Sequence, residues 1–413
     1  MPETSRHSLA ILGAGPVGLE SAALALELGF DVHVLERGEP GAHAIAWGHV
    51  RMFTPWCMNI GPATARLLGR HGWGAPPADV CPTGLELAER VLQPLATTPE
   101  LKTRVHAHSQ VVQLSRHGAR KNERAGDSVR TDHPFRLLVR DMGGRESFLH
   151  AHAVMDATGT FGQPNWAGTG GIPARGETYL APQMSYHPDD VLGVRRERHA
   201  GKTTLVIGGG ASAVTTVTLL AQLAGEVPGT RVAWVTRRAT PGFAGETSND
   251  SLPARAALYA EGRRLQTGGA DAVHWSGGGE VESMEYNSGT HRYRVQLATP
   301  AGARVEEADQ VIVNCGYGPD PSLYRELRVH ECYETLAPMK LAAALLGAGT
   351  SDCTAIPAFG VDQLASPEPD FYIVGAKSYG RSSDFLLQTG YRQVADVLAR
   401  LAESAGLRAA QEA

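Results

Sequence analysis

The chain has 413 residues, of which 42% are hydrophobic and 20% are charged, and its formal net charge is −5. This length exceeds what one hydrophobic core serves and predicts roughly two or three domains. Because the charges nearly balance, the sequence offers no electrostatic case for binding nucleic acid or an anionic membrane. It has no run of ~20 apolar residues that would predict a transmembrane helix, and residues 1–8 lack the apolar core of a signal peptide. We therefore expect a cytoplasmic protein.

A glycine-rich turn follows the first apolar run, Leu9–Leu12, and a helix and a second strand come after it. In a dinucleotide-binding unit, the first glycine (Gly13) permits a tight turn, the second (Gly15) lets the backbone approach a pyrophosphate, and the third (Gly18) lets helix and strand pack closely. The helix N-terminus favours the negative charge. The second strand ends at Glu36, whose carboxylate can accept hydrogen bonds from a ribose 2′-hydroxyl. The residues predicted to bind this first cofactor are Gly13, Gly15, Pro16, Val17, Gly18, Glu36 and Arg37.

The same plan recurs in the middle of the chain, where the strand Leu205–Ile207 runs into a second glycine-rich turn and a helix that reaches about Leu223. The next strand, Arg231–Arg238, ends in two arginines instead of an acid. Guanidinium groups pair with a 2′-phosphate, so we assign NADPH to this unit and a cofactor with an unphosphorylated ribose to the first. The alternative is that the two arginines are only the solvated end of a strand. The predicted NADPH-binding residues are Gly208, Gly210, Ala211, Ser212, Ala213, Arg237 and Arg238.

A β-hairpin, a buried strand and a turn of small residues follow each glycine-rich unit, in 129–160 and again in 291–320. The first small turn is Ala157-Thr158-Gly159, and the second contains Gly316. This repetition predicts an α/β fold of two Rossmann-like, three-layer dinucleotide-binding domains, the second inserted into the first. We place the first domain at 1–195, the inserted domain at 196–314, and the rest of the first domain at 315–413. The last part includes a helix at 333–349, over the substrate pocket or at a subunit interface.

The end of the chain completes the first domain with a strand in 370–380 and a helix in 383–406. Apolar side chains recur at helical spacing along this helix. Its N-terminal end, at Leu387 and Gln388, is expected to direct the positive end of the helix dipole at an electron-accepting ring.

Together these segments resemble the two-dinucleotide-binding-domain flavoproteins, and within that group the flavin-containing and N-hydroxylating monooxygenases are most similar. The resemblance is specific at the two glycine-rich turns, at Ala157-Thr158-Gly159 and at the C-terminal helix. It implies FAD in the first domain and NADPH in the inserted one, with hydride passing from nicotinamide to flavin. It also implies that the backbone of Val111 meets the adenine. The residues that it places beside the flavin ring are Arg51, Phe53, Pro55 and Cys57.

One position departs from the family. The last FAD strand usually ends in Gly-Asp, with the acid on the ribityl chain. This sequence has Gly375-Ala376 there. We retain Gly375 as an expected FAD contact and expect the ribityl contact to come from elsewhere.

The activity that the resemblance implies is monooxygenation. Reduced flavin adds molecular oxygen at C4a, a small soft nucleophile (nitrogen or sulfur) takes the distal oxygen of the hydroperoxide, and retained NADP⁺ helps to exclude water. No side-chain nucleophile and no metal is required. The expected partners are a small-molecule substrate and oxygen, and a homodimer is a common assembly for this architecture.

Other activities stay open. The five cysteines contain no C-x-x-C pair, which argues against a disulfide reductase of the thioredoxin-reductase type. Cys57 and Cys353 still allow a mixed thiol mechanism, and a direct reductase of a low-molecular-weight disulfide needs no protein thiol. Outside enzymes, the alternative is a non-catalytic flavin redox sensor, although a sensor needs no dedicated hydride donor.

Two histidine pairs, His106/His108 and His150/His152, have the i, i+2 spacing of one strand face. No cluster of cysteines or acids accompanies them, so we predict no metal site. We expect these histidines to be half-exposed strand residues.

Overall fold

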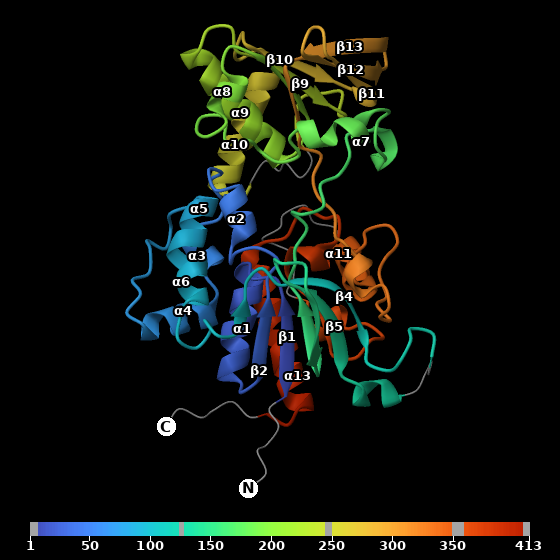
Figure 1. The fold of residues 1–413 in the computed structure, drawn as a ribbon. Helices are drawn as coiled ribbons and strands as arrows, with labels where there is room; N and C mark the ends of the chain where they lie inside the picture. The colour runs from blue at the N-terminus through green and yellow to red at the C-terminus, as the bar shows by residue number, and fades with distance from the viewer. Residues whose placement is uncertain (1–6, 124–127, 244–249, 349–358, 408–413) are drawn as a thin grey trace. The chain divides into compact units, whose positions relative to one another are not determined.

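The structure is a computed structural model that describes residues 7–123, 128–243, 250–348 and 359–407. The chain divides into two compact units (Figure 1). Unit 1 comprises Met1–Phe161 and Gly318–Ala413, and unit 2 is the intervening segment Gly162–Tyr317. The chain therefore leaves unit 1, forms unit 2 and returns to complete unit 1.

A five-stranded parallel sheet forms the centre of unit 1, in the order β15-β7-β1-β2-β3. Its strands are short apolar runs, and β1 is buried along almost its whole length because both faces of the sheet are covered. β1 pairs with β2 on one side and with β7 on the other. The strands are β1 (Ser8–Leu12), β2 (Asp31–Leu35), β3 (Val105–His106), β7 (Ala153–Asp156) and β15 (Phe371–Ile373).

Helices cover one face of this sheet. α1 packs against α13 and α4, and the periodic apolar side chains of α13 are buried in the same core. The predicted C-terminal helix is thereby confirmed. The helices of unit 1 are α1 (Pro16–Glu27), α2 (Ala42–Ala46), α3 (Trp56–Asn59), α4 (Pro62–Arg70), α5 (Gly84–Leu87), a π-helical turn (Ala88–Leu92), α6 (Gln93–Ala96), α11 (Met339–Ala348), α12 (Val361–Leu364) and α13 (Leu387–Ser404).

An antiparallel sheet of three strands covers the other face of the parallel sheet in unit 1. Phe135 and Leu137 of this second sheet pack in one core with Leu12 and Phe371 of the first. Its strands are β4 (Gln110–Arg116), β5 (Phe135–Arg140) and β6 (Glu146–Ala151). Unit 1 thus has three layers, which are helices, parallel sheet and antiparallel sheet.

Unit 2 repeats this plan with a four-stranded parallel sheet in the order β10-β9-β8-β14. Helices α9 and α10 pack on one face, and a three-stranded antiparallel sheet shares a core with the other. The predicted fold class, two Rossmann-like three-layer domains, is therefore confirmed. The elements are α7 (Glu177–Leu180), α8 (Arg196–His199), β8 (Thr203–Ile207), α9 (Ala211–Glu226), β9 (Arg231–Thr236), α10 (Pro253–Gln266), β10 (Val273–Gly277), β11 (Glu280–Asn287), β12 (Arg292–Thr299), β13 (Gly302–Ala308) and β14 (Gln310–Val313).

The units do not divide at the expected domain bounds. The segment 162–195, expected in the first domain, lies in unit 2. Main-chain bridges join it to the sheets of unit 2, from Arg175 to Ser283 and from Ser185 to Ile312. The second division falls after Tyr317 instead of at 314/315, and Tyr317 itself bridges to 164.

Several elements end earlier or begin later than predicted. The strand expected in 370–380 stops at Ile373, because a 3₁₀ helix, Gly375–Tyr379, begins with Gly375 at φ +73°. The helix expected from Tyr333 begins at Met339. In the described part of the chain, no helix has the length and apolar character needed to cross a membrane.

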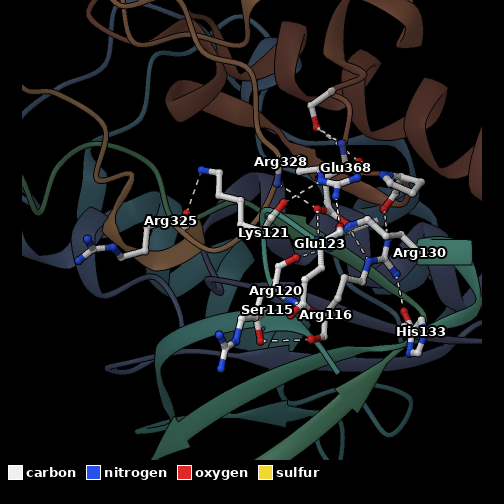
Figure 2. Close-up of polar contacts among 12 residues, drawn as sticks. Ser115, Arg116, Arg120, Lys121, Glu123, Arg130, His133, Arg325, Arg328 and Glu368 are labelled. Carbon is white, nitrogen blue, oxygen red and sulfur yellow. Dashed lines mark hydrogen bonds and ion pairs between the residues drawn. The ribbon is translucent and has the colours of Figure 1, made fainter. Parts of the chain in front are cut away.

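A buried ion cluster joins the two chain segments that form unit 1 (Figure 2). The Glu368 side chain is 0% exposed. Its Oε1 accepts a hydrogen bond from Arg116 Nε at 2.8 Å, and its Oε2 accepts from Arg130 Nη2 at 2.8 Å and from the Arg328 amide at 3.0 Å. Burial alone would raise the pKa of the Glu368 carboxyl, but the hydrogen bonds from Arg130 and Arg116 hold it below its usual value.

The same arginines hold part of the polar loop that follows β4. Arg130 Nη1 donates to the carbonyl oxygen of Arg120 at 3.0 Å, and Arg328 Nε donates to that of Lys121 at 2.9 Å. The described start of this loop is therefore fixed by charge-assisted hydrogen bonds, whereas 124–127 lies outside the described residues.

Replacing Glu368 by Gln should lower the free energy of unfolding by about 3 kcal/mol, because two buried guanidinium groups lose their counter-charge. The matched control is Glu146→Gln, which breaks the exposed Arg140–Glu146 pair of 2.7 Å and should cost less than about 1 kcal/mol. Urea unfolding followed by circular dichroism measures both.

The difference between E368Q and the wild type should also depend on pH. Because the pKa of Glu368 is lowered in the folded state, its contribution is complete above the pKa of the unfolded chain and is lost as pH falls through the folded value. The deficit of E368Q should therefore shrink below about pH 4. Equal deficits in E368Q and E146Q at neutral pH would contradict this role.

Candidate functional site

The first glycine-rich turn lies at the carboxyl end of β1, between that strand and α1. Gly13 has a φ of +96°, and its amide donates to the carbonyl oxygen of Leu35 at 2.8 Å, which joins the turn to the end of β2. A Cβ added at Gly18 would lie 1.9 Å from the carbonyl oxygen of Gly13. The protein's own geometry therefore requires both glycines, Gly13 for its conformation and Gly18 for the close approach of α1 to β1.

Gly15 is not required in this way. Its φ of −81° and ψ of −175° suit any residue, and an added Cβ would meet nothing within 4 Å. It is the N-cap of α1, where the amides of Val17 and Gly18 have no acceptor within the helix. The absence of a side chain at this point suits the approach of a phosphate group to the backbone and to the helix N-terminus.

Glu36 directly follows β2, and its carboxylate lies beside the turn. Oε2 accepts a hydrogen bond from the Ala14 amide and Oε1 accepts one from the Gly38 amide, both at 2.7 Å. Each oxygen keeps a lone pair for a hydroxyl donor. Glu36 thus has the position that a ribose-binding acid requires, and Arg37 beside it is exposed.

Four chain segments meet at this end of the sheet. A Cβ added at Gly13 would lie 2.9 Å from the carbonyl oxygen of Ala157. Added Cβ atoms at Gly375 and Gly390 would lie 3.3 Å and 2.8 Å from the Val17 side chain. The fold therefore brings together these predicted residues: the first turn (Gly13, Gly15, Pro16, Val17, Gly18), the small turn (Ala157, Thr158, Gly159), Gly375, and Leu387 and Gln388 at the start of α13.

A buried ion pair that the sequence reasoning missed lies at the same edge. Lys377 Nζ donates to Asp156 Oδ2 at 2.7 Å and to Thr158 Oγ1 at 3.2 Å. Asp156 Oδ1 accepts from the amide and hydroxyl of Thr158, at 3.1 and 2.6 Å. The pair fixes the small turn and joins it to the segment after β15. The available signal was a lysine in the short 3₁₀ helix that follows the buried strand β15, but its partner is distant in sequence.

A pocket of about 400 Å³ lies next to this pair in unit 1. Lys377 Nζ is 4.9 Å from the ring centroid of Tyr324, whose hydroxyl donates to Glu331 at 2.5 Å, and both of these residues line the pocket. Burial raises the pKa of Tyr324 and of Glu331.

The predicted flavin-facing residues lie in a segment that contacts 78–84. Arg51 Nη1 donates to the carbonyl oxygen of Cys81, and the Cys57 amide donates to that of Ala78. Cys57 is exposed, whereas Phe53 and Pro55 are half-buried. Their place beside a flavin stays a prediction, as does the adenine contact of Val111, which lies at a β-bulge in β4.

The second glycine-rich turn, in unit 2, repeats the geometry of the first. Gly208 has a φ of +141°, and an added Cβ would lie 2.2 Å from the carbonyl oxygen of Asn314. Trp234 Nε1 donates to the Gly208 carbonyl oxygen at 2.9 Å. Gly210 has φ −97° and ψ 179°, and an added Cβ would meet nothing within 4 Å. Ala213, fully buried, takes the place of the third glycine, and Ala211 and Ser212 begin α9.

Arg237 and Arg238 come directly after β9, and both are exposed. The carbonyl oxygen of Arg238 accepts from the Thr236 hydroxyl at 2.9 Å, so the backbone is held while the guanidinium groups stay at the surface. Burial raises the pKa of Cys315 to about 12, and the charge of Arg237 opposes this rise.

The prediction that each histidine pair shares a strand face was wrong. β3 ends at His106, and His108 has a φ of +52° outside it. β6 ends before His152, whose Nδ1 lies 2.7 Å from the Ser8 hydroxyl oxygen. Among the residues that the structure describes, no three of histidine, cysteine, aspartate and glutamate form a group that could hold a metal.

The sequence matches no protein-family model and no curated protein. Solved structures share its fold. A bacillithiol disulfide reductase from Bacillus cereus has a TM-score of 0.67 at 17% identity, covering 97% of this chain and 100% of its own. The FAD-bound cadaverine monooxygenase DfoA from Erwinia amylovora has a TM-score of 0.65 at 14% identity (99% and 97% covered). The ornithine N-hydroxylase KtzI of Kutzneria sp. 744, with reduced FAD, NADP⁺ and L-ornithine, has 0.64 at 16% identity (97% and 99%). The fold expected from the sequence, with two Rossmann-like domains, is thereby confirmed.

Replacing Gly15 by Val should leave the fold intact but weaken binding of a dinucleotide to unit 1, assayed with FAD, by at least about tenfold. The new side chain meets no protein atom but occupies the space before the helix N-terminus. Isothermal titration of flavin-free protein measures the affinity, and thermal unfolding checks the fold. Gly210→Val is the matched control in unit 2 and should leave FAD affinity unchanged. Unchanged FAD affinity in Gly15→Val would contradict the assignment.

Proposed function

We propose that this chain is an oxidoreductase that uses FAD and NADPH, with FAD bound by unit 1 and NADPH by unit 2. The observation that carries the proposal is the pair of glycine-rich turns, in which neither packing nor conformation requires Gly15 or Gly210. Two such turns in one chain suit a hydride donor and a hydride acceptor. The similar DfoA is bound to FAD, and KtzI holds reduced FAD with NADP⁺, which supports this pair of cofactors.

In unit 1, the amides at the start of α1 bind the pyrophosphate of FAD, and Glu36 accepts hydrogen bonds from a ribose. The small turn at Ala157-Thr158-Gly159 and the N-terminus of α13 complete the site. Lys377 takes no part in the chemistry. It holds the small turn in place through Asp156, and it directly follows Ala376, where the similar flavoproteins carry an acid.

In unit 2, the amides at the start of α9 bind the pyrophosphate of NADPH. Arg237 and Arg238 bind the 2′-phosphate, because both are exposed directly beyond the second strand of the unit. Two guanidinium groups and no acid at this position favour NADPH over NADH.

When bound, FAD takes a hydride from NADPH and transfers electrons to a second acceptor. We propose molecular oxygen as that acceptor, and a small molecule with a soft nitrogen or sulfur nucleophile as the compound that is oxygenated. Arg51, Phe53 and Pro55 line the substrate side of the ring, where they position the substrate and exclude water. Support comes from the fold that this chain shares with a cadaverine monooxygenase and an ornithine N-hydroxylase.

A second candidate is the reduction of a low-molecular-weight disulfide. The fold is shared equally with a bacillithiol disulfide reductase, and an exposed thiol, Cys57, lies in the segment proposed to face the flavin. This activity uses the same two cofactors, so that only the final electron acceptor differs.

A stopped-flow experiment distinguishes the two acceptors. The protein is reduced anaerobically with NADPH and then mixed with oxygenated buffer. For a monooxygenase we expect a transient absorbing species between reduced and oxidised flavin, because the site excludes water. A single-step return to oxidised flavin, together with faster reoxidation by hydroxyethyl disulfide than by oxygen, would contradict oxygenation and support the reductase.

A further inference from the structure

The segment 51–64, which carries the side chains proposed to face the flavin, is attached to the rest of unit 1 at several points. Its first half pairs with 78–84 through main-chain hydrogen bonds. Its second half contains α3 and α4, which pack against α13 and α1 respectively. Two buried side chains that lie far away in the sequence, Tyr391 of α13 and Glu20 of α1, hold this second half.

Tyr391 holds the end of α3. Its hydroxyl donates to the carbonyl oxygen of Asn59, the last residue of α3, at 2.6 Å. This carbonyl has no partner available within so short a helix. Burial and, second, the charge of Glu20 raise the pKa of Tyr391 well above its ordinary value, so the hydroxyl stays protonated and remains a donor.

The Asn59 side chain extends this attachment to the beginning of the turn. Its Nδ2 donates to the Thr54 carbonyl oxygen at 2.8 Å, and its Oδ1 accepts from the Thr54 hydroxyl at 2.7 Å. Both residues are buried. Thr54 lies between Phe53 and Pro55, so the backbone of these two residues is fixed, through Asn59, to Tyr391.

Glu20 holds the start of α4. Its Oε1 accepts from the Ala63 amide at 2.9 Å and its Oε2 accepts from the Thr64 amide at 2.8 Å. Both amides lie in the first turn of α4, where they have no acceptor within the helix. Glu20 therefore caps a helix other than its own, and the dipole of α4 favours negative charge at this end.

Gly61 shows that this approach of the carboxylate constrains the sequence. It is the N-cap of α4, and its φ of −72° and ψ of 150° suit any residue. An added Cβ, however, would lie 2.1 Å from Glu20 Oε2. A larger residue at 61 would displace the carboxylate from the two amides, so the position of Glu20 is what requires a glycine here.

We propose that Glu20 and Tyr391 are positioning residues, which fix the segment 51–64 against the two helices that border the FAD site. Each lies about one turn after the first residue of its helix, and the N-termini of these helices are the ones assigned to FAD. This rests on the proposed function in one respect, namely that Phe53 and Pro55 face the flavin. Both positioning residues act through the main chain of the segment, which they keep against the ring so that it limits the access of water.

Hydrogen–deuterium exchange of the full-length protein, read by mass spectrometry of its peptides, tests the attachment. Tyr391→Phe keeps the ring and removes one hydrogen bond, so the amides of 54–64 should exchange about tenfold faster. Tyr293→Phe is the matched control, because the buried Tyr293 donates to the Gln183 carbonyl oxygen at 3.2 Å in unit 2. It should leave exchange in 54–64 unchanged. Unchanged exchange in 54–64 of Tyr391→Phe would overturn the proposal.

Glu20 is tested through the glycine that it requires. In the wild type, Gly61→Ala should speed exchange at the start of α4, because the new Cβ meets the Glu20 carboxylate. In a Glu20→Ala background the same change meets no carboxylate and should add little. An equal increase from Gly61→Ala in both backgrounds would contradict the role of Glu20.

Iodide quenching of the fluorescence of bound FAD separates this inference from the proposed function. The quenching constant should rise about twofold in Tyr391→Phe, because a loosened segment exposes the ring, and stay unchanged in Tyr293→Phe. Faster exchange with unchanged quenching would overturn the placement of this segment against the flavin. If exchange is faster but the protein binds no FAD, the attachment stands and the proposed function fails. If NADPH reduces bound FAD but exchange is unchanged, the positioning role fails and the proposed function stands.

Discussion

The close contact between α1 and β1 is the constraint on which the first nucleotide site depends. A side-chain carbon at Gly18 would lie 1.9 Å from the Gly13 carbonyl oxygen, so helix and strand approach at the distance of bare backbone. Because of this contact, the first amides of α1 point into the space next to Gly15. Unit 2 reaches the same arrangement by a different route, because Gly208 lies against the Asn314 carbonyl oxygen and Ala213 replaces the third glycine. Backbone geometry, more than particular side chains, therefore builds both sites.

Because unit 2 interrupts unit 1, the segment that returns to unit 1 has to be held against it, and buried ion pairs hold it there. The returning segment must dock on strands made much earlier in the chain. Glu368 provides one attachment through Arg116 and Arg130, and Lys377 provides another through Asp156. Buried ion pairs of this kind add little net stability compared with apolar groups, but removing one partner is costly. They consequently fix where the chain returns, and with it the small turn that borders the proposed FAD site.

The features that depend on local sequence patterns could be predicted from the sequence. Apolar runs that end in glycine-rich turns gave the strands, the helices and the fold class, and Gly13, Gly18 and Gly208 have the geometry expected of them. The rest depends on contacts between distant segments. The partner of Lys377 lies far away in the chain, and no spacing rule connects the two residues.

The predicted domain bounds differ from the bounds of the observed units for a similar reason. The segment 162–195 contains little regular structure, and its bridges to strands β11 and β14 and its side chains in the core of unit 2 place it in that unit.

The central claim is that a nicotinamide in unit 2 reduces a flavin in unit 1. Anaerobic titration of the purified, FAD-loaded protein with NADPH tests it most directly, with the flavin absorbance near 450 nm followed at each addition. The account predicts complete bleaching of the flavin band at a molar ratio near one NADPH per FAD, because one hydride reduces one flavin. A protein that retains no FAD, or one whose bound FAD stays oxidised under excess NADPH while dithionite reduces it, would contradict the account.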